Sequence, residues 1–340
     1  MKNRTIKQIR CSNIELLRIV ALLLIMLGHT HLRISPFPRM QDACMEPLSS
    51  FGKLMLSCIA TTGVGIFIAI SGWFGIKFRV NGLAKYLFSV VFILWTVYGL
   101  AIAFHLTDFN MNGILYSLTF YEGYWFVIGY LGLYLISPLL NSFIEHASKR
   151  EYQIVLLSYY LFQSYYSWTT AWYDYYNGYS IILFGGIYLT AAYLRKYPIE
   201  WLRKHAEVLL VGVFLLMTII AYLSTWKLGH AGRQIRDDNP LVIFAAILLL
   251  LSFSKRKFQS RIVNWLAASC FAVYLIHFSP FVYPYFMKYI QLVYSQFDGL
   301  AYGIMLILAL FSVFLACTLY DQIRILVWNG LNKKASRRRQ

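Results

Sequence analysis

Ten apolar segments, each close to the length that crosses a lipid bilayer, dominate this 340-residue chain. They lie near residues 14–31, 54–75, 86–106, 124–142, 152–169, 179–194, 207–226, 240–254, 264–286 and 300–328. Because backbone polar groups cannot hydrogen-bond to lipid, each segment is expected to be helical. Ten spans leave about 34 residues for each helix and its connection, too few for a soluble domain. We therefore predict an all-α, polytopic integral membrane protein whose residues 1–340 form a single domain.

Lys and Arg are concentrated in alternate connections between these segments. With the N-terminus placed in the cytoplasm, 22 of the 31 Lys and Arg residues fall on the inner side and seven on the outer side. The inner regions are the basic tails 1–13 and 329–340 and the connections 77–85, 145–151, 195–206 and 255–263; the outer ones are 32–53, 107–123, 170–178, 227–239 and 287–299. This positive-inside bias predicts two cytoplasmic termini. Anionic lipid headgroups account for the net charge of +17, so no nucleic acid partner is expected.

The first apolar segment carries Arg18 and His29, eleven residues apart. At about 100° per residue, the two side chains fall within roughly 20° of each other on a helix, about 16 Å apart along its axis. Glu15 borders the same stripe, whereas His31 points about 200° away from His29. Since charged residues within a membrane usually face a partner or a wet cavity, the stripe is interpreted as one wall of a reaction path. The simpler alternatives are an Arg18–Glu15 pair near the membrane interface and an interfacial histidine.

The sequence contains no motif that indicates a bound metal or nucleotide cofactor. The His and Cys residues do not have the spacing of a zinc site, and the chain contains neither a P-loop nor a G-x-G-x-x-G motif. Of the five cysteines, only Cys44 falls in an outer connection, where it has no partner for a disulfide. We predict no bound metal or cofactor.

Four segments resemble, in order along the chain, the signature segments of the membrane acyltransferase-3 family. The first is Ser12–His31, in which Arg18 and His29 match a basic residue, ten intervening residues and a histidine. The others are Gly63–Trp73, which ends in Ser-Gly and an aromatic residue, Tyr124–Leu140, with Trp-Phe near its start and Pro-Leu-Leu at its end, and Ala268–His277, with Tyr-Leu-x-His. Ten helices are the usual core of that family.

The resemblance implies transfer of an acyl group, usually acetyl from acetyl-CoA, to sugars of cell-surface glycans. By motif position, His29 is the expected catalytic histidine and Arg18 its basic partner. Many members carry an arginine pair in the connection after the second helix, and this chain does not. Its Lys77, Arg79 and Lys85 are expected to contact the acyl-CoA, with membrane topology as the other explanation of their charge. The extracytoplasmic hydrolase-like domain that some members append is not expected here.

Six further residues are expected to support the site: Glu15, Ser71, Gly72, Trp125, Tyr274 and His277. Ser71 and Gly72 also fit close helix packing, and the i, i+3 pair Tyr274 and His277 also fits a buried hydrogen-bonded pair. Histidine suits the general base that removes the proton from a sugar hydroxyl, with a transient acyl-histidine as the alternative.

Arg18 would bind a phosphate or carbonyl oxygen of the donor. We expect a polar path through the bundle, lined by Glu15, Arg18 and His29.

These observations predict an O-acyltransferase of the bacterial cytoplasmic membrane with His29 as general base. Its expected partners are membrane lipid, acyl-CoA as co-substrate, and an envelope polysaccharide or lipid-linked glycan as acceptor. A transporter or flippase of an envelope precursor is an alternative, because it too can hold buried charges around a wet interior. Within the resemblance, transfer of succinyl or another acyl group is the other alternative.

Overall fold

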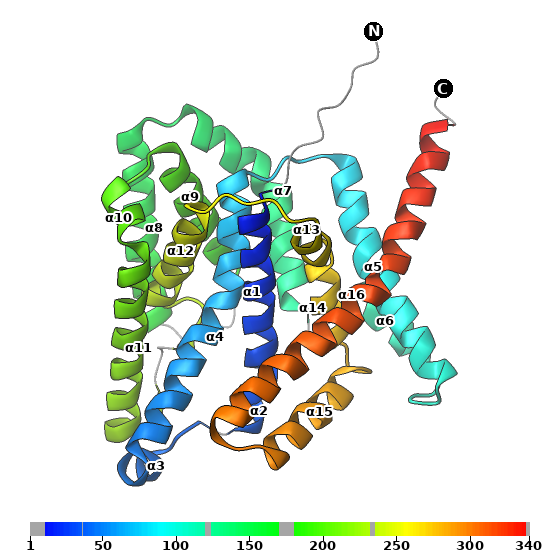
Figure 1. Cartoon of the computed structure of the whole chain (residues 1–340). Helices are drawn as coiled ribbons and strands as arrows, with labels where there is room; N and C mark the ends of the chain where they lie inside the picture. The colour runs from blue at the N-terminus through cyan, green and yellow to red at the C-terminus, as the bar shows by residue number, and fades with distance from the viewer. Residues whose placement is uncertain (1–10, 36, 120–123, 170–179, 232–234, 338–340) are drawn as a thin grey trace.

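The computed structural model describes residues 11–35, 37–119, 124–169, 180–231 and 235–337, which form helices and no strand (Figure 1). The helices are α1 (Ser12–His29), α2 (His31–Ile34), α3 (Met40–Met45), α4 (Pro47–Phe74), α5 (Val80–Ala103), α6 (Met111–Thr119), α7 (Trp125–His146), α8 (Lys149–Thr169), α9 (Ile181–Lys196), α10 (Glu200–Lys204), α11 (Ala206–Leu228), α12 (Pro240–Ser254), α13 (Arg261–Ala267), α14 (Cys270–His277), α15 (Tyr283–Gln296) and α16 (Gly299–Arg337). The all-α class predicted from the sequence is confirmed for these residues.

Six helical segments among the described residues are long and apolar enough to cross a membrane, which supports a membrane protein but not the full count of ten. They are Ser12–Ile34, Pro47–Phe74, Val80–Ala103, Trp125–His146, Ala206–Leu228 and Gly299–Lys333. Helix α12 is apolar but has only 15 residues, and α9 has 16. Helix α8 has sufficient length, but many of its residues are polar or tyrosine.

The ninth predicted span, 264–286, is not one continuous helix. It is divided into α13 and α14, with a break at Ala268–Ser269, and α15 begins only at Tyr283. Pro280 lies in the turn after α14, where the absence of a backbone N–H helps to end the helix. The sequence predicted the apolar character of this segment, but not its division into shorter helices.

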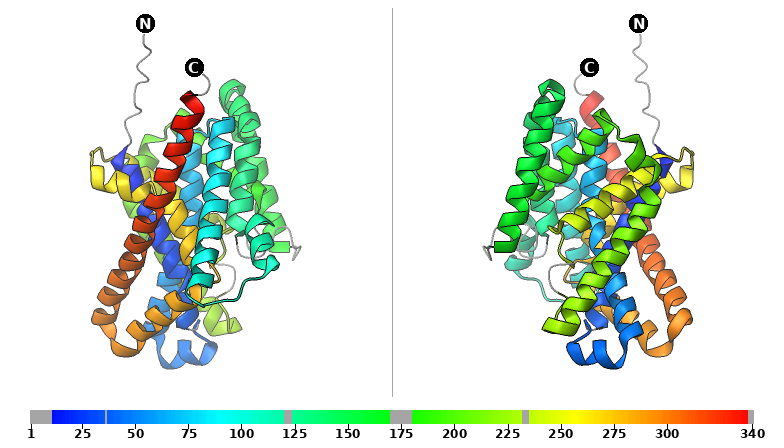
Figure 2. Two further views of the ribbon diagram at one scale, coloured as in Figure 1. Left: turned by 90° about the vertical axis from the view of Figure 1, so that its right-hand side faces the viewer. Right: turned by 90° about the vertical axis from the view of Figure 1, so that its left-hand side faces the viewer.

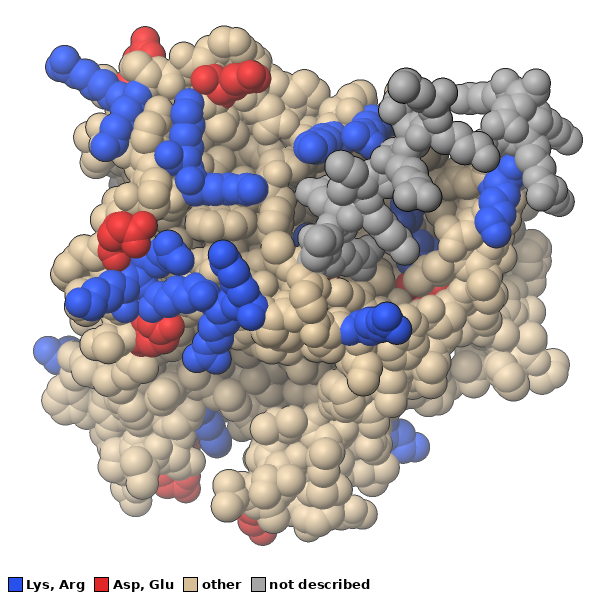
Figure 3. Space-filling model, turned by 45° about the horizontal axis from the view of Figure 1, so that its top comes forward, with Lys and Arg blue, Asp and Glu red and all other residues tan. Residues whose placement is uncertain are grey.

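The connections rich in Lys and Arg lie at one end of the molecule, together with both ends of the described chain (Figures 1 and 2). We call this the basic end; it carries the connections 75–79, 147–148, 197–199 and 255–260, with Lys and Arg in the first and last of them and on the helix ends that flank the other two. Helices α2, α3 and α15 lie at the opposite end (Figure 1). Seen with the basic end turned forward, Lys and Arg side chains gather over this face (Figure 3).

Helix α4 organises the core, since it packs against α1, α9, α11 and α12. At Gly72 the backbone of α4 lies directly against α9, because an added Cβ would collide with the backbone of Tyr188. The start of α1 is tied to α13 by a hydrogen bond of 2.9 Å from the Ser12 hydroxyl to the Asn264 side chain. These contacts hold α1 and α4 in place relative to their neighbours. Both helices contribute residues to the site described below.

A buried ion pair within α16 is joined to α5 by a hydrogen bond. The Arg324 guanidinium donates to Asp321 at 2.5 and 2.8 Å and to the Ser89 hydroxyl at 3.0 Å. Both charged residues are buried, so the pair satisfies within the bundle a charge that would otherwise be costly there.

Candidate active site

A cavity of about 310 Å³ lies beside α1, and both Arg18 and His29 line it. We call it the central cavity. Its lining comes from α1 (Arg18, Leu22, Ile25, His29), α4 (Val64, Phe67, Ser71), α5 (Tyr86), α7 (Trp125, Phe126, Tyr130) and the α13–α14 region (Ala267, Ala268, Cys270, Phe271, Tyr274). The four α1 residues follow at steps of four, three and four, so one face of a regular helix forms this wall. Arg18 and His29 therefore lie on the same face of α1, as their spacing predicts, as the first and last of its four lining residues.

Helix α1 ends at His29, and this end separates the two neighbouring histidines. The regular helix is interrupted at Thr30, whose N–H bonds to the Leu27 carbonyl oxygen three residues back, and a new short helix begins at His31. The His31 ring turns to α16, where its Nδ1 lies 2.5 Å from the Tyr302 hydroxyl, and it is not part of the cavity lining. Of the two residues, only His29 is positioned to meet a substrate in the central cavity.

His29 is hydrogen-bonded to a second histidine, His277, at the end of α14. The distance from His29 Nδ1 to His277 Nε2 is 3.0 Å, and His277 Nδ1 lies 2.7 Å from the carbonyl oxygen of Val273. A carbonyl only accepts, so His277 carries its proton on Nδ1, and in its neutral form His277 Nε2 accepts from the Nδ1–H of His29. This arrangement leaves Nε2 of His29 as the ring atom with a free lone pair.

Two aromatic residues that follow α14 hold His29 in place. The His29 ring stacks on Phe278, with centroids 4.3 Å apart. The Tyr283 hydroxyl donates to the carbonyl oxygen of His29 at 2.5 Å, which satisfies an acceptor that the end of α1 leaves without an intrahelical partner. Ring and backbone are thus both held by residues that follow α14 in the chain.

Arg18 lines the central cavity while paired with Glu15 one turn earlier. The Arg18 Nη1 lies 3.3 Å from Glu15 Oε2. Glu15 is buried and is not part of the cavity lining. The predicted polar wall therefore consists of Arg18 and His29, with Glu15 behind Arg18 as its counter-ion.

The other supporting residues divide between the cavity wall and the packing around it. Ser71, Trp125 and Tyr274 line the cavity. The Ser71 hydroxyl lies 3.0 Å from the Phe67 carbonyl oxygen and 3.2 Å from the Tyr130 hydroxyl, so it is already engaged in hydrogen bonds. Gly72 faces away from the cavity, against Tyr188.

Lys77, Arg79 and Lys85 line neither the central cavity nor the larger cavity at the basic end described below. All three are exposed near the start of α5. The backbone of Arg79 is held by the Tyr134 hydroxyl, which lies 3.1 Å from its nitrogen and 3.0 Å from its carbonyl oxygen. This leaves their side chains at the surface of the basic end.

The sequence did not reveal that His277 is the partner of His29, although the late Tyr-Leu-x-His segment marked the residue. It also missed Tyr86, Phe126 and Tyr130 as cavity residues. Tyr86 stacks on Phe271 with centroids 5.0 Å apart and donates to the Val127 carbonyl oxygen. The aromatic residues make most of the cavity wall apolar, so the polar groups that reach it are few and distinct.

No group of three or more His, Cys, Asp or Glu residues in the described part of the chain is arranged to hold a metal ion.

The fold and the cavity define an integral membrane protein with a histidine and an arginine on one wall of an internal site. The model of the acyltransferase-3 family, described as an acyltransferase domain, matches residues 12–321. The chain therefore belongs to the acyltransferase-3 family and is a membrane acyltransferase. No curated protein and no solved structure matches it.

Proposed function

We propose that this protein transfers an acyl group, acetyl in the first instance, from acyl-CoA to a hydroxyl of a cell-envelope glycan, with His29 as general base. The observation that carries the proposal is the His29–His277 hydrogen bond, because it leaves Nε2 of His29 unprotonated at a residue of the cavity wall. A base within hydrogen-bonding reach of the acceptor is what a sugar hydroxyl needs as it attacks a thioester.

The proton and the leaving group then follow a simple sequence. Nε2 of His29 takes the hydroxyl proton while the hydroxyl oxygen bonds to the thioester carbonyl carbon. The carbon–sulfur bond breaks, and the CoA sulfur leaves with the proton returned by the imidazolium. His277 keeps its own proton on Nδ1, donated to the Val273 carbonyl oxygen, throughout, and acts as a positioning residue that orients the base.

Arg18 is assigned to the donor rather than to the reacting carbonyl. The two residues are separated by about 16 Å along α1, which is too far for one guanidinium to stabilise charge that develops beside His29. Its planar donor group suits a phosphate or amide oxygen of an extended donor. The proposal does not extend to Lys77, Arg79 and Lys85, because their side chains lie at the surface of the basic end and line neither cavity.

The cellular placement completes the proposal. The positive-inside rule puts the basic end in the cytoplasm, where acyl-CoA is found, and the membrane is the bacterial cytoplasmic membrane. The acceptor is an envelope polysaccharide or a lipid-linked glycan.

Mass spectrometry of the surface glycan tests this function. Cells with the wild-type protein should carry an acetyl substituent that is absent without the protein and absent with His29→Ala, provided that the variant accumulates in the membrane. His31→Ala is the matched control and should keep the substituent. A succinyl mass increment would change the donor, and an unchanged substituent in His29→Ala cells would reject His29 as the base. A change in glycan amount without any lost substituent would favour a flippase.

A further inference from the structure

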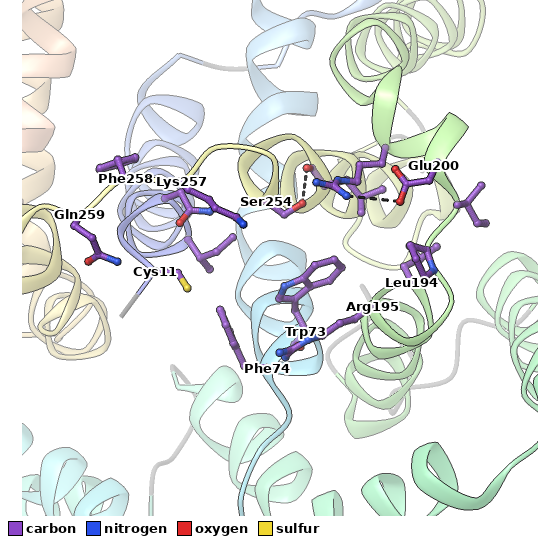
Figure 4. A pocket seen from close by; sticks show the side chains of 16 residues that line it. Cys11, Trp73, Phe74, Leu194, Arg195, Glu200, Ser254, Lys257, Phe258 and Gln259 are labelled. Carbon is purple, nitrogen blue, oxygen red and sulfur yellow. Dashed lines mark hydrogen bonds and ion pairs between the residues drawn. The ribbon is translucent and has the colours of Figure 1, made fainter. Parts of the chain in front are cut away.

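A second and larger cavity, of about 580 Å³, opens at the basic end (Figure 4). It lies between the start of α1, the end of α4, the α9–α10 region and the connection from α12 to α13. Figure 4 shows Lys257 on that connection and Arg195 beside Trp73 and Phe74. We call it the basic-end cavity.

Positive charge exceeds negative charge in this cavity. Arg195, Arg203 and Lys257 line it, and Glu200 is the one carboxylate among its described lining residues. Glu200 pairs with Arg203 at 3.6 Å, so it neutralises one cation and leaves two. Cations gathered around a concave surface with few acidic neighbours favour an anionic ligand.

Arg195 is held in a fixed orientation at the wall of the cavity. Its guanidinium donates to the carbonyl oxygen of Trp73, at the end of α4, and lies 5.5 Å from the centroid of the Phe74 ring. A guanidinium has five N–H donors, so this contact leaves others for a phosphate. Trp73, which is half-buried, adds an aromatic surface to the same cavity.

The basic-end cavity and the central cavity share the same two helices. On α1, Ile14 lines the first cavity and Arg18, one turn further, lines the second. On α4, Phe74 lines the first and Ser71, three residues earlier, lines the second. The basic-end cavity thus lies at the start of α1, and Arg18 and then His29 follow it further along the same helix.

We propose that the basic-end cavity binds the phosphate-bearing nucleotide end of acyl-CoA, through Arg195 and Lys257. This inference rests on the proposed function, because acyl-CoA is the proposed donor. Its anionic end meets the two cations that Glu200 leaves without compensation, and its thioester arm extends past Arg18 toward His29. The donor phosphates thus bind away from Lys77 and Arg79, whose side chains line neither cavity.

Equilibrium binding of CoA and of 3′,5′-ADP to purified protein in nanodiscs of neutral lipid tests the assignment. Both probes should bind the wild-type protein, and 3′,5′-ADP should compete with CoA. The double variant Arg195→Gln/Lys257→Gln should weaken binding of both probes at least tenfold, as expected when charge-assisted hydrogen bonds to phosphate are lost. The matched control Lys77→Gln/Arg79→Gln removes the same charge from the same end and should leave both affinities within about twofold.

Three outcomes would overturn the inference: unchanged affinities in the Arg195/Lys257 variant, equal losses in both double variants, or no binding of 3′,5′-ADP to the wild-type protein. An anionic lipid headgroup has the same phosphate chemistry, so the measurement is repeated in nanodiscs that contain phosphatidylglycerol. A headgroup site would show as an effect of the variant on lipid retention without an effect on 3′,5′-ADP.

A glycan that stays unacylated while CoA binding depends on Arg195 and Lys257 would reject the proposed function and keep the binding site.

Discussion

The two cavities differ in size and in chemical character. The central cavity, about 310 Å³, has mainly aromatic walls, one ion-paired arginine and one histidine held by a second histidine. The basic-end cavity, about 580 Å³, has cations from three chain segments and a single carboxylate among its described lining residues. Hydrogen bonds that fix one ring suit a chemical step, whereas spaced cations suit recognition of an anion. Substitutions of His29 and its partner His277 should therefore change the rate of transfer, and substitutions of the basic-end cations should change donor affinity.

The largest effect is expected from His29→Ala. Loss of a general base typically lowers the rate by about 10²–10⁴-fold, and CoA affinity should change little because the phosphates bind at the other cavity. The rate of acyl transfer in membranes, measured together with CoA binding, gives both quantities. His31→Ala should keep nearly full activity, since its ring contacts Tyr302 outside the cavity. Equal losses at His29 and His31 would contradict the assignment.

His277 tests whether orientation of the base matters. His277→Leu removes the acceptor of the His29 Nδ1–H and leaves that donor without its partner. We expect a loss of about 10–100-fold in the transfer rate, in line with the cost of such an unpaired group. His277→Gln keeps an acceptor oxygen in its side chain and should recover part of the rate. If both variants are equally impaired while the protein remains folded, His277 has a purely structural role.

Arg18 lines the central cavity one turn along α1 from Ile14, which lines the basic-end cavity. Its substitution should have an intermediate effect, on the affinity for the donor. Arg18→Ala should weaken CoA binding by about tenfold, and Arg18→Lys should recover it partly, because lysine keeps the charge without the planar group. Arg18→Ala also leaves the buried Glu15 carboxylate unpaired. The double variant Glu15→Gln/Arg18→Ala separates these effects, since it removes the orphaned charge. Recovery of CoA binding in the double variant would assign Arg18 a structural role.

The smallest effect is expected at Ser71. Its hydroxyl is engaged with Phe67 and Tyr130, and a neutral hydrogen bond contributes about 0.5–1.5 kcal/mol to stability. Ser71→Ala should therefore keep acyl transfer within about twofold and lower the melting temperature slightly. An activity loss as large as that of His29→Ala would instead make Ser71 a nucleophile and change the mechanism.

The part of the site that could be predicted from the sequence is the part that depends on the geometry of a single helix. The shared face of Arg18 and His29 depends only on the regular rotation of one helix, and α1 is regular over that interval. The partner of His29 could not be found in this way, because His277 is 248 residues away and its position depends on how α14 breaks from α13.

Apolar composition predicted the helices better than their continuity. Segment 264–286 has the same hydropathy whether it forms one span or two short helices, and only Ser269 and Pro280 marked the interruptions. Similarly, Arg195 and Lys257 were explained by membrane topology, since a charge count does not show which connections meet in space.

The close contact at Gly72 has a consequence for any attempt to alter substrate size. Helix α4 contributes Ser71 to one cavity and Phe74 to the other, and the neighbouring α9 carries Arg195. A side chain at Gly72 would push α4 away from α9 and so displace the α4 wall of both cavities at once. Natural or engineered changes in the acyl group accepted should therefore arise at wall positions that face one cavity alone, and variation at residue 72 should be rare among active forms.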